Sequence, residues 1–213
     1  MRKSIIAIAC CIVLLLLGYT GYRGYQVWKQ SHLIAMAKGF AAKSDFRNEL
    51  LCLQQVVAVN PRNLEACHLM ADLTESARSP AALIWRQRIV ELNPKSVTDR
   101  LTLAQTAMVF QDFTTATNVL AGVDDVGRKT PAYHNLAGVM AIKVGDVSDA
   151  EKHFSEAVRL EPANPVPQVN LAVVRLHSSN ALDMAEARID LKRISLNSTN
   201  FSLRAQAARE LIM

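Results

Sequence analysis

The five histidines are the first residues to test for chemistry, because an imidazole can bind a metal ion or transfer a proton. Each lies in a separate predicted helix, and none has a second histidine or a glutamate at the spacing of a metal site. The five are His32, His68, His134, His153 and His177. His134 falls on an inward-facing helical position, so we expect a packed imidazole there and not a ligand.

The cysteines also lack the spacing of a reactive site. Cys52 and Cys67 are separated by 15 positions, unlike the short Cys-x-x-Cys of zinc and redox sites. We expect buried thiols, and a disulfide between adjacent helices stays open if the domain lies in an oxidising compartment. Cys10 and Cys11 come before the most apolar part of an apolar run, which favours helix wall residues over lipid attachment.

Carboxylates and glycines give no catalytic pattern either. Asp124 and Asp125 adjoin in a loop, where solvation is the simplest interpretation. The sequence has no Gly-x-Gly-x-x-Gly or phosphate-loop motif, and Gly145-Asp146 is a turn signal. Nucleophile, base and oxyanion donors are not recognisable together. We therefore expect no enzyme activity, no metal, no cofactor and no small-molecule substrate.

Charge argues against a nucleic-acid partner. The formal net charge of the 213 residues is +5, but four basic residues and no acidic residue lie in the first 29. The remainder carries 20 basic and 19 acidic residues, a net of +1. A nucleic-acid surface needs a concentrated basic face to displace counterions from phosphates. The main part of the chain is close to neutral.

The N-terminus has the pattern of a membrane anchor. Residues 4–22 carry no charge, and 19 helical residues reach about 28 Å, close to the thickness of a bilayer's hydrocarbon core. Tyr19, Tyr22, Tyr25 and Trp28 follow at intervals of three and are typical of an interfacial aromatic belt. A cleaved signal peptide is the alternative, but no Ala-x-Ala site ends the run. We predict a transmembrane helix with an aromatic flank over residues 1–29.

The orientation of this anchor depends on a small charge difference. Arg2, Lys3 and the terminal amine face Arg23 and Lys29 across the run. The bias favours a cytoplasmic N-terminus. We therefore expect a single-pass protein of a bacterial inner membrane with its main domain in the periplasm; a cytoplasmic domain stays open.

The rest of the chain is predicted to be helical hairpins. Between Pro131 and Asn164, apolar residues recur at helical spacing on both sides of Gly145-Asp146, and Pro162 ends the second run. Ser44, Ser79 and Asn180 are expected N-caps of second helices in such hairpins. A single hairpin of this size has too little core to be stable alone.

The hairpin recurs, and the recurrence resembles the tetratricopeptide repeat. Three predicted helices of similar sequence end at Pro61, Pro94 and Pro162. Successive prolines are 33 and 68 residues apart, which is one and then two copies of a period near 34. In the copy from Pro131, the pattern of that family is carried by a small set of residues. They are His134, Ala137, Gly138, Ala141, Ala150, Phe154 and Pro162. In the first copy Glu49 stands where the family has a small alanine.

This resemblance implies an all-α, right-handed α-solenoid of about five hairpins, preceded by one transmembrane helix. The repeats are assigned to residues 30–198, as 30–63, 64–96, 97–130, 131–164 and 165–198. Residues 199–213 are expected to form a C-terminal capping helix, as solenoids require.

The resemblance further implies that the first helices of the hairpins line a concave groove for a protein partner. The groove residues implied are Ile34, Lys38, Leu101, Gln105, Met108, Asn135, Val139, Ile142, Val169, Val173 and Leu176. Because this set is mostly apolar, we expect a hydrophobic helix or strand as ligand. Two functions follow as hypotheses: a membrane-anchored scaffold or adaptor in bacterial envelope assembly or secretion, or a non-catalytic regulatory subunit that recruits or inhibits an enzyme at the membrane.

Overall fold

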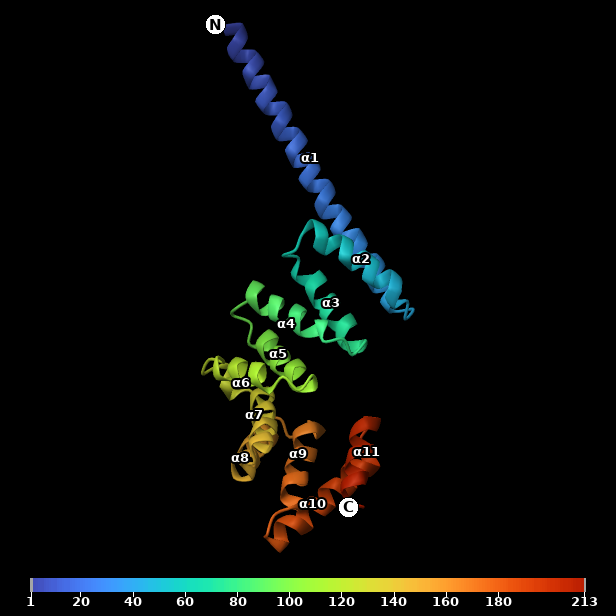
Figure 1. The fold of residues 1–213 in the computed structure, drawn as a ribbon, viewed down its shortest axis with the longest axis vertical. Helices are drawn as coiled ribbons and strands as arrows, with labels where there is room; N and C mark the ends of the chain where they lie inside the picture. Colours follow the sequence, from blue (N-terminus) through green and yellow to red (C-terminus); the bar gives the residue numbers. More distant parts are fainter. Residues whose placement is uncertain (1, 213) are drawn as a thin grey trace. The chain divides into compact units, whose positions relative to one another are not determined.

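The computed structural model describes the backbone of residues 2–212 and the side chains of residues 15–212. The described residues form eleven α-helices, one 3-10 helix and connecting turns (Figure 1). The chain divides into two compact units, residues 1–92 and residues 93–213, and each is described by itself.

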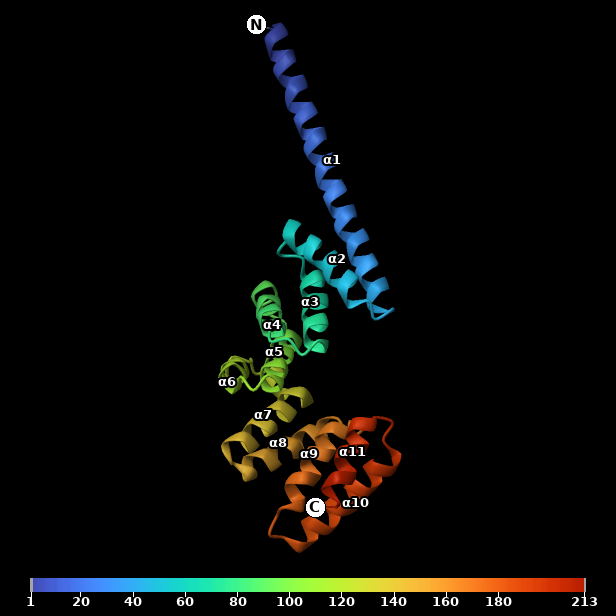
Figure 2. The same cartoon turned by 45° about the vertical axis from the view of Figure 1, so that its right-hand side comes forward.

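The first unit consists of two helical hairpins. Its helices are α1 (Arg2–Ala41), α2 (Phe46–Val59), α3 (Leu64–Ser76) and α4 (Ala81–Leu92). Only the C-terminal part of α1 packs along α2, and its N-terminal part projects beyond the rest of the unit (Figures 1 and 2). At 1.5 Å per residue, the 40 residues of α1 reach about 60 Å. The core holds Ala37, Leu53, Met70 and Leu73, with Trp85 packed against it.

The predicted anchor falls in α1, but the side chains of residues 1–14 lie outside the described part of the structure. Cys10 and Cys11 are therefore also outside it. Over the residues that could be searched, no helix is both long and apolar enough to cross a membrane. The described part of the aromatic flank is solvent-exposed, with Tyr19, Tyr22 and Trp28 each more than half accessible.

The second unit continues the pattern of antiparallel helices. It contains α5 (Val97–Val109), α6 (Phe113–Ala121), η1 (Gly127–Lys129), α7 (Pro131–Val144), α8 (Val147–Leu160), α9 (Pro165–Leu176), α10 (Ala181–Asn197) and α11 (Phe201–Glu210). α11 packs on the last hairpin, where Leu203 and Ala207 join a core with Val169 and Leu191. In this way α11 covers apolar surface that α9 and α10 would otherwise expose.

Helix starts follow the side-chain capping rules. Asn180 caps α10 as expected, since its Oδ1 accepts from the Leu182 amide at 3.0 Å. At the start of α4, the Ser79 hydroxyl accepts from the Ala81 amide at 3.3 Å. The prediction for Ser44 is wrong: Asp45 caps α2, and Ser44 takes a left-handed turn conformation with φ +56°. The two neighbours compete for one cap, and the carboxylate also complements the helix dipole.

Close packing joins α7 to α8. The Phe154 ring is 2% exposed and lies directly over Gly138. A Cβ atom on Gly138 would stand 2.6 Å from Phe154 Cε1, which is inside van der Waals contact. The hairpin turn uses Gly145 with φ +82°, a conformation that side chains other than glycine rarely adopt.

Candidate partner-binding clefts

A hollow of the second unit with a mainly apolar lining lies between α5, α7 and α9. It has a volume of about 430 Å³. We call it the α5/α7/α9 cleft; its described lining is Val97, Thr98, Leu101, Thr102, Gln105, Thr130, Pro131, Ala132, Asn135, Leu136, Glu161, Asn164, Val166 and Pro167. Three of the predicted groove residues, Leu101, Gln105 and Asn135, are among them.

This cleft combines an apolar floor with neutral polar edges. Leu101 and Leu136 are both less than 10% exposed and belong to one core, so the floor is held rigidly. The exposed amide of Gln105 and the half-buried amide of Asn135 flank it. Glu161 carries the charge among the described lining residues, and its carboxylate accepts from Asn164 Nδ2 at 2.9 Å. Such a lining can hold apolar side chains while its amides bond to a peptide backbone.

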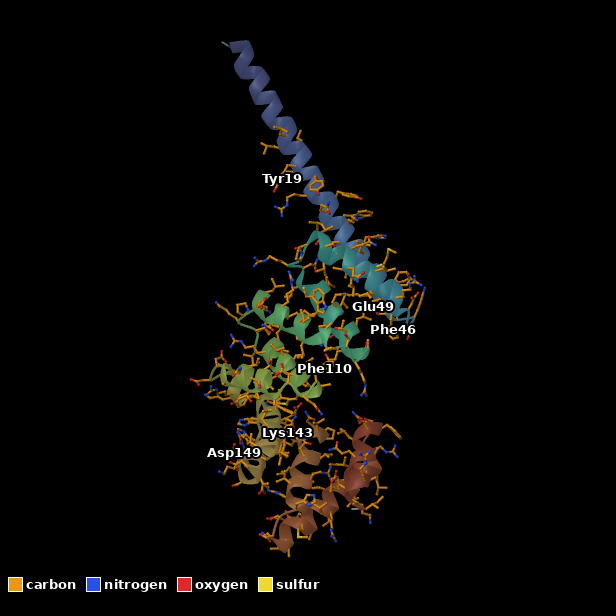
Figure 3. All side chains as sticks on the ribbon, viewed as in Figure 1. Tyr19, Phe46, Glu49, Phe110, Lys143 and Asp149 are labelled. Atoms are coloured by element: carbon orange, nitrogen blue, oxygen red, sulfur yellow. The ribbon has the colours of Figure 1, made fainter. Side chains whose placement is uncertain are left out.

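A second hollow of about 280 Å³ lies between α7, α8, α9 and α11. We call it the α7/α9/α11 pocket; its described lining is Val139, Ile142, Lys143, Val147, Phe154, Asn170, Val173, Val174, His177 and Gln206. Val139, Ile142 and Val173 are predicted groove residues. Lys143, labelled on α7 in Figure 3, holds its ammonium 5.1 Å from the centroid of the Phe113 ring. The Lys143 ammonium thus makes a cation–π contact with the Phe113 ring.

One hydrogen bond connects the borders of the two hollows. Asn170 Nδ2 donates to Asn135 Oδ1 at 2.9 Å. Asn135 lines the α5/α7/α9 cleft and Asn170 lines the α7/α9/α11 pocket. The amide pair ties α7 to α9 across the face that both hollows share.

The other predicted groove residues do not line these two hollows. Ile34 and Val169 are buried in the cores of their units. Lys38 forms an ion pair with Glu65, with 2.6 Å between Nζ and Oε1. Met108 packs against the core of α5 to α7, and Leu176 against the core of α9 to α11.

A histidine pair was missed by the sequence reasoning. His134 Nδ1 and His153 Nδ1 are 3.0 Å apart across the α7–α8 hairpin, and both rings lie beside Tyr133. Burial, and then the neighbouring His153, lower the pKa of His134 below its usual value. His134 lies 11 residues before Gly145 and His153 seven residues after Asp146, so one histidine stands in each helix of the predicted hairpin. Their unequal distances from the turn gave no clear signal that the two rings would meet.

A charged cluster between α2, α3 and α4 was also missed. Arg86 is 9% exposed, and one of its terminal nitrogens contacts Asp72 at 2.7 Å and Glu75 at 2.8 Å. Glu49, labelled in Figure 3, is 5% exposed. Burial, and then the charge of Asp72, raise the pKa of the Glu49 carboxyl. Only the packing of three helices brings these residues together.

Neither the histidine pair nor the Arg86 cluster resembles a metal centre. Within the part of the chain that was searched, no three histidine, cysteine or carboxylate side chains converge on a possible ion position. Cys52 and Cys67 are both buried free thiols, and burial raises the pKa of each. A raised thiol pKa opposes the formation of a reactive thiolate.

Comparisons with known proteins give a match for the fold. No protein-family model matches the sequence, and no curated protein matches it significantly. Similar solved structures include a thermophilic TPR protein of Thermus thermophilus, with TM-score 0.64 and 17% identity over 86% of this chain and 100% of that one. A tetratricopeptide repeat protein of Parabacteroides merdae gives 0.65 and 15%, over 86% and 73% of the two chains. PilF of Pseudomonas aeruginosa gives 0.64 and 12%, over 87% and 90%.

At these identities the likeness concerns the fold and not the role. The helical hairpins, the caps and the close packing of Phe154 on Gly138 agree with it. The described residues therefore form an all-helical, tetratricopeptide-like solenoid.

Proposed function

We propose that this protein is a non-catalytic scaffold or adaptor, held at a bacterial inner membrane by the N-terminal part of α1, that captures a protein partner for envelope assembly or secretion. The observation that carries the proposal is the α5/α7/α9 cleft, with its apolar floor and amide edges. An apolar helix or strand of a partner is the ligand class that this lining suits. The adjoining α7/α9/α11 pocket extends the same face.

The anchor rests on the uncharged run of residues 4–22 and on the form of α1. The helix that begins at Arg2 continues without interruption into the first hairpin. A span of this kind would hold the repeats close to the bilayer surface. The repeat domain faces the periplasm in this proposal, since Arg2 and Lys3 favour a cytoplasmic N-terminus.

Crosslinking in intact cells tests the cleft. A photoreactive residue replaces Gln105 in the cleft, Val139 in the pocket, or the exposed Lys152 on α8 as the control. One protein should be trapped from Gln105 and Val139 and not from Lys152. Equal products from all three positions, or none from the first two, would refute partner capture at this face.

Alkaline extraction and protease accessibility test the anchor and its orientation. The full chain should stay with membranes at alkaline pH. A variant with Leu15→Lys and Leu16→Lys should be extracted, because each lysine at mid-bilayer costs about 3 kcal/mol. The repeats should be cleaved by protease once the outer membrane is permeabilised. Extraction of the unaltered chain would exclude the anchor, and protection of the repeats would reverse the orientation.

A further inference from the structure

A third hollow lies in the first unit, where the aromatic flank of α1 meets the turn between α2 and α3. It has a volume of about 450 Å³. We call it the α1–turn cleft; its described lining includes Tyr19, Tyr22, Arg23, Gln26, Gln30 and Asn60. The turn between α2 and α3, which borders it, lies at the end of the unit from which the N-terminal part of α1 projects (Figures 1 and 2).

The polar floor of this cleft is built by amides. Gln30 Oε1 accepts from Asn60 Nδ2 at 2.9 Å and from Asn63 Nδ2 at 3.1 Å, which fixes the turn against α1. Gln26 Oε1 is buried and has no hydrogen-bond partner. A buried acceptor without a donor is costly. This oxygen is closed off from the cleft, so a ligand there would meet the lining amides of Gln30 and Asn60 instead.

The charge of the cleft and its surroundings is positive. Arg23 lines the cleft, with its guanidinium 5.9 Å from the centroid of the Tyr19 ring. Two further arginines lie at the turn between α2 and α3. Arg62 is part of the turn and is exposed, and Arg88 of α4 donates from Nε to the Pro61 carbonyl at 2.9 Å. No carboxylate is among the described lining residues. Glu65, in the first turn of α3, is already paired with Lys38.

The position of the cleft along α1 selects its ligand. Tyr19 and Tyr22 end the uncharged run, and both rings are about 60% exposed (58% and 62%). Exposed tyrosine rings beside arginine are suited to the headgroup layer of a bilayer. Clustered arginines next to a membrane helix attract anionic lipids at about 1 kcal/mol each.

From this combination we propose that the α1–turn cleft binds the headgroup of an anionic phospholipid that carries a hydroxyl group, of the phosphatidylglycerol type. Arg23 faces the phosphate, Arg62 adds attraction from the turn, and a glycerol hydroxyl bonds to the lining amides of Gln30 or Asn60. The inference rests on the proposed membrane anchor. It adds a specific lipid contact that would set the depth and rotation of the first hairpin at the surface.

Native mass spectrometry of the full chain, released from nanodiscs with equal phosphatidylcholine and phosphatidylglycerol, tests the proposal. The unaltered chain should retain phosphatidylglycerol in preference. Arg23→Gln and Arg62→Gln should each reduce that preference about fivefold. Lys43→Gln and Arg47→Gln are the matched controls, because they remove the same charge at the turn between α1 and α2 and should leave the preference unchanged.

Each outcome has a distinct meaning. Failure of the unaltered chain to enter nanodiscs or to resist alkaline extraction would remove the anchor, and this inference with it. A stable anchor without lipid preference, or an equal loss in the control variants, would overturn the lipid site alone. Loss of the bound lipid in excess inorganic phosphate would indicate a small-anion site and would likewise overturn it.

Discussion

The α1–α2 hairpin and the α7–α8 hairpin use the same repeat pattern but pack it differently. The place that Ala150 holds in α8 is held by Glu49 in α2, and both residues are buried. In α7–α8 the alanine lies in the same core as Phe154, whose ring rests on Gly138. In α1–α2 the equivalent core carries a carboxyl whose pKa is raised by burial. One hairpin is held by apolar fit, and the other tolerates a buried acid.

This difference suggests that the two hairpins have been shaped by different demands. A small residue at this place lets two helices approach closely, and the match of aromatic to glycine then adds packing energy. A glutamate at the same place weakens its hairpin unless it contributes elsewhere. Four substitutions would break or sharpen the contrast, from the largest expected effect to the smallest.

Removal of the aromatic ring should break the apolar hairpin. Phe154→Ala is expected to lower the free energy of unfolding by about 4 kcal/mol, since the ring is fully buried and its loss leaves a cavity over Gly138. Urea unfolding followed by circular dichroism measures the loss. Leu53→Ala, at the same place in α2, is the comparison and should cost less. An equal or smaller loss for Phe154→Ala would contradict the contrast.

Arg86→Met should destabilise the first unit by about 2 kcal/mol. The substitution leaves Asp72 and Glu75 without their shared cation, beside the already desolvated Glu49. Both tryptophans, Trp28 and Trp85, lie in this unit, so tryptophan fluorescence during urea unfolding reports on it.

The exposed Arg47→Met is the control for Arg86→Met and should change little. Combining Arg86→Met with the neutral substitutions Asp72→Asn and Glu75→Gln should recover part of the lost free energy of unfolding. No recovery would mean that the arginine acts through packing and not through charge.

Restoring the repeat pattern should stabilise the first hairpin. Glu49→Ala is expected to raise the free energy of unfolding by about 1 kcal/mol at pH 7. The folded-state pKa of Glu49 is raised, so the unaltered protein regains stability as the pH falls through that pKa toward 4.5. The advantage of Glu49→Ala should therefore shrink at acidic pH in fluorescence-monitored urea unfolding. A constant advantage across pH would locate its cause in packing.

The histidine pair should give a small acid sensitivity to the other hairpin. The pKa of His134 is lowered in the folded state, so the unfolded chain takes up its proton first as the pH falls through 6.5. Stability is thus lost on acidification, opposite in sign to Glu49. Asp149, Glu156 and Arg159 are the charged neighbours on α8.

Urea unfolding between pH 7.5 and 5 compares the unaltered chain with His134→Asn, which should lose less stability on acidification. His177→Asn, an exposed position, is the control and should behave like the unaltered chain. Identical pH dependence of all three would show that His134 does not contribute to the acid sensitivity.

Much of the fold could be predicted from the sequence because its signals are local. Caps such as Asn180, the Gly145 turn and the period of the apolar residues depend on neighbours along the chain. The prediction for Ser44 was wrong by one residue, because adjacent Ser and Asp give the same capping signal. Helix ends are uncertain from sequence at this level.

The candidate site was predictable only where repeat positions define it. Leu101, Gln105 and Asn135 come to one cleft because the first helices of adjoining hairpins present equivalent faces. The Asn135–Asn170 hydrogen bond joins two helices through residues 35 positions apart in the sequence. The Arg86–Glu75 contact likewise joins two helices, through residues 11 positions apart. No local spacing of residues predicts such contacts between helices, so they could not be predicted from the sequence.

The uninterrupted course of α1 also sets an angular phase between its two ends. No turn or linker separates the aromatic flank from the residues that pack on α2, so both belong to one helical ribbon. Each residue added between Trp28 and Leu33 would rotate the first hairpin by about 100° about the helix axis, whereas seven would return it to within about 20°. The direction in which the first hairpin faces is thus encoded in the number of residues in a single helix.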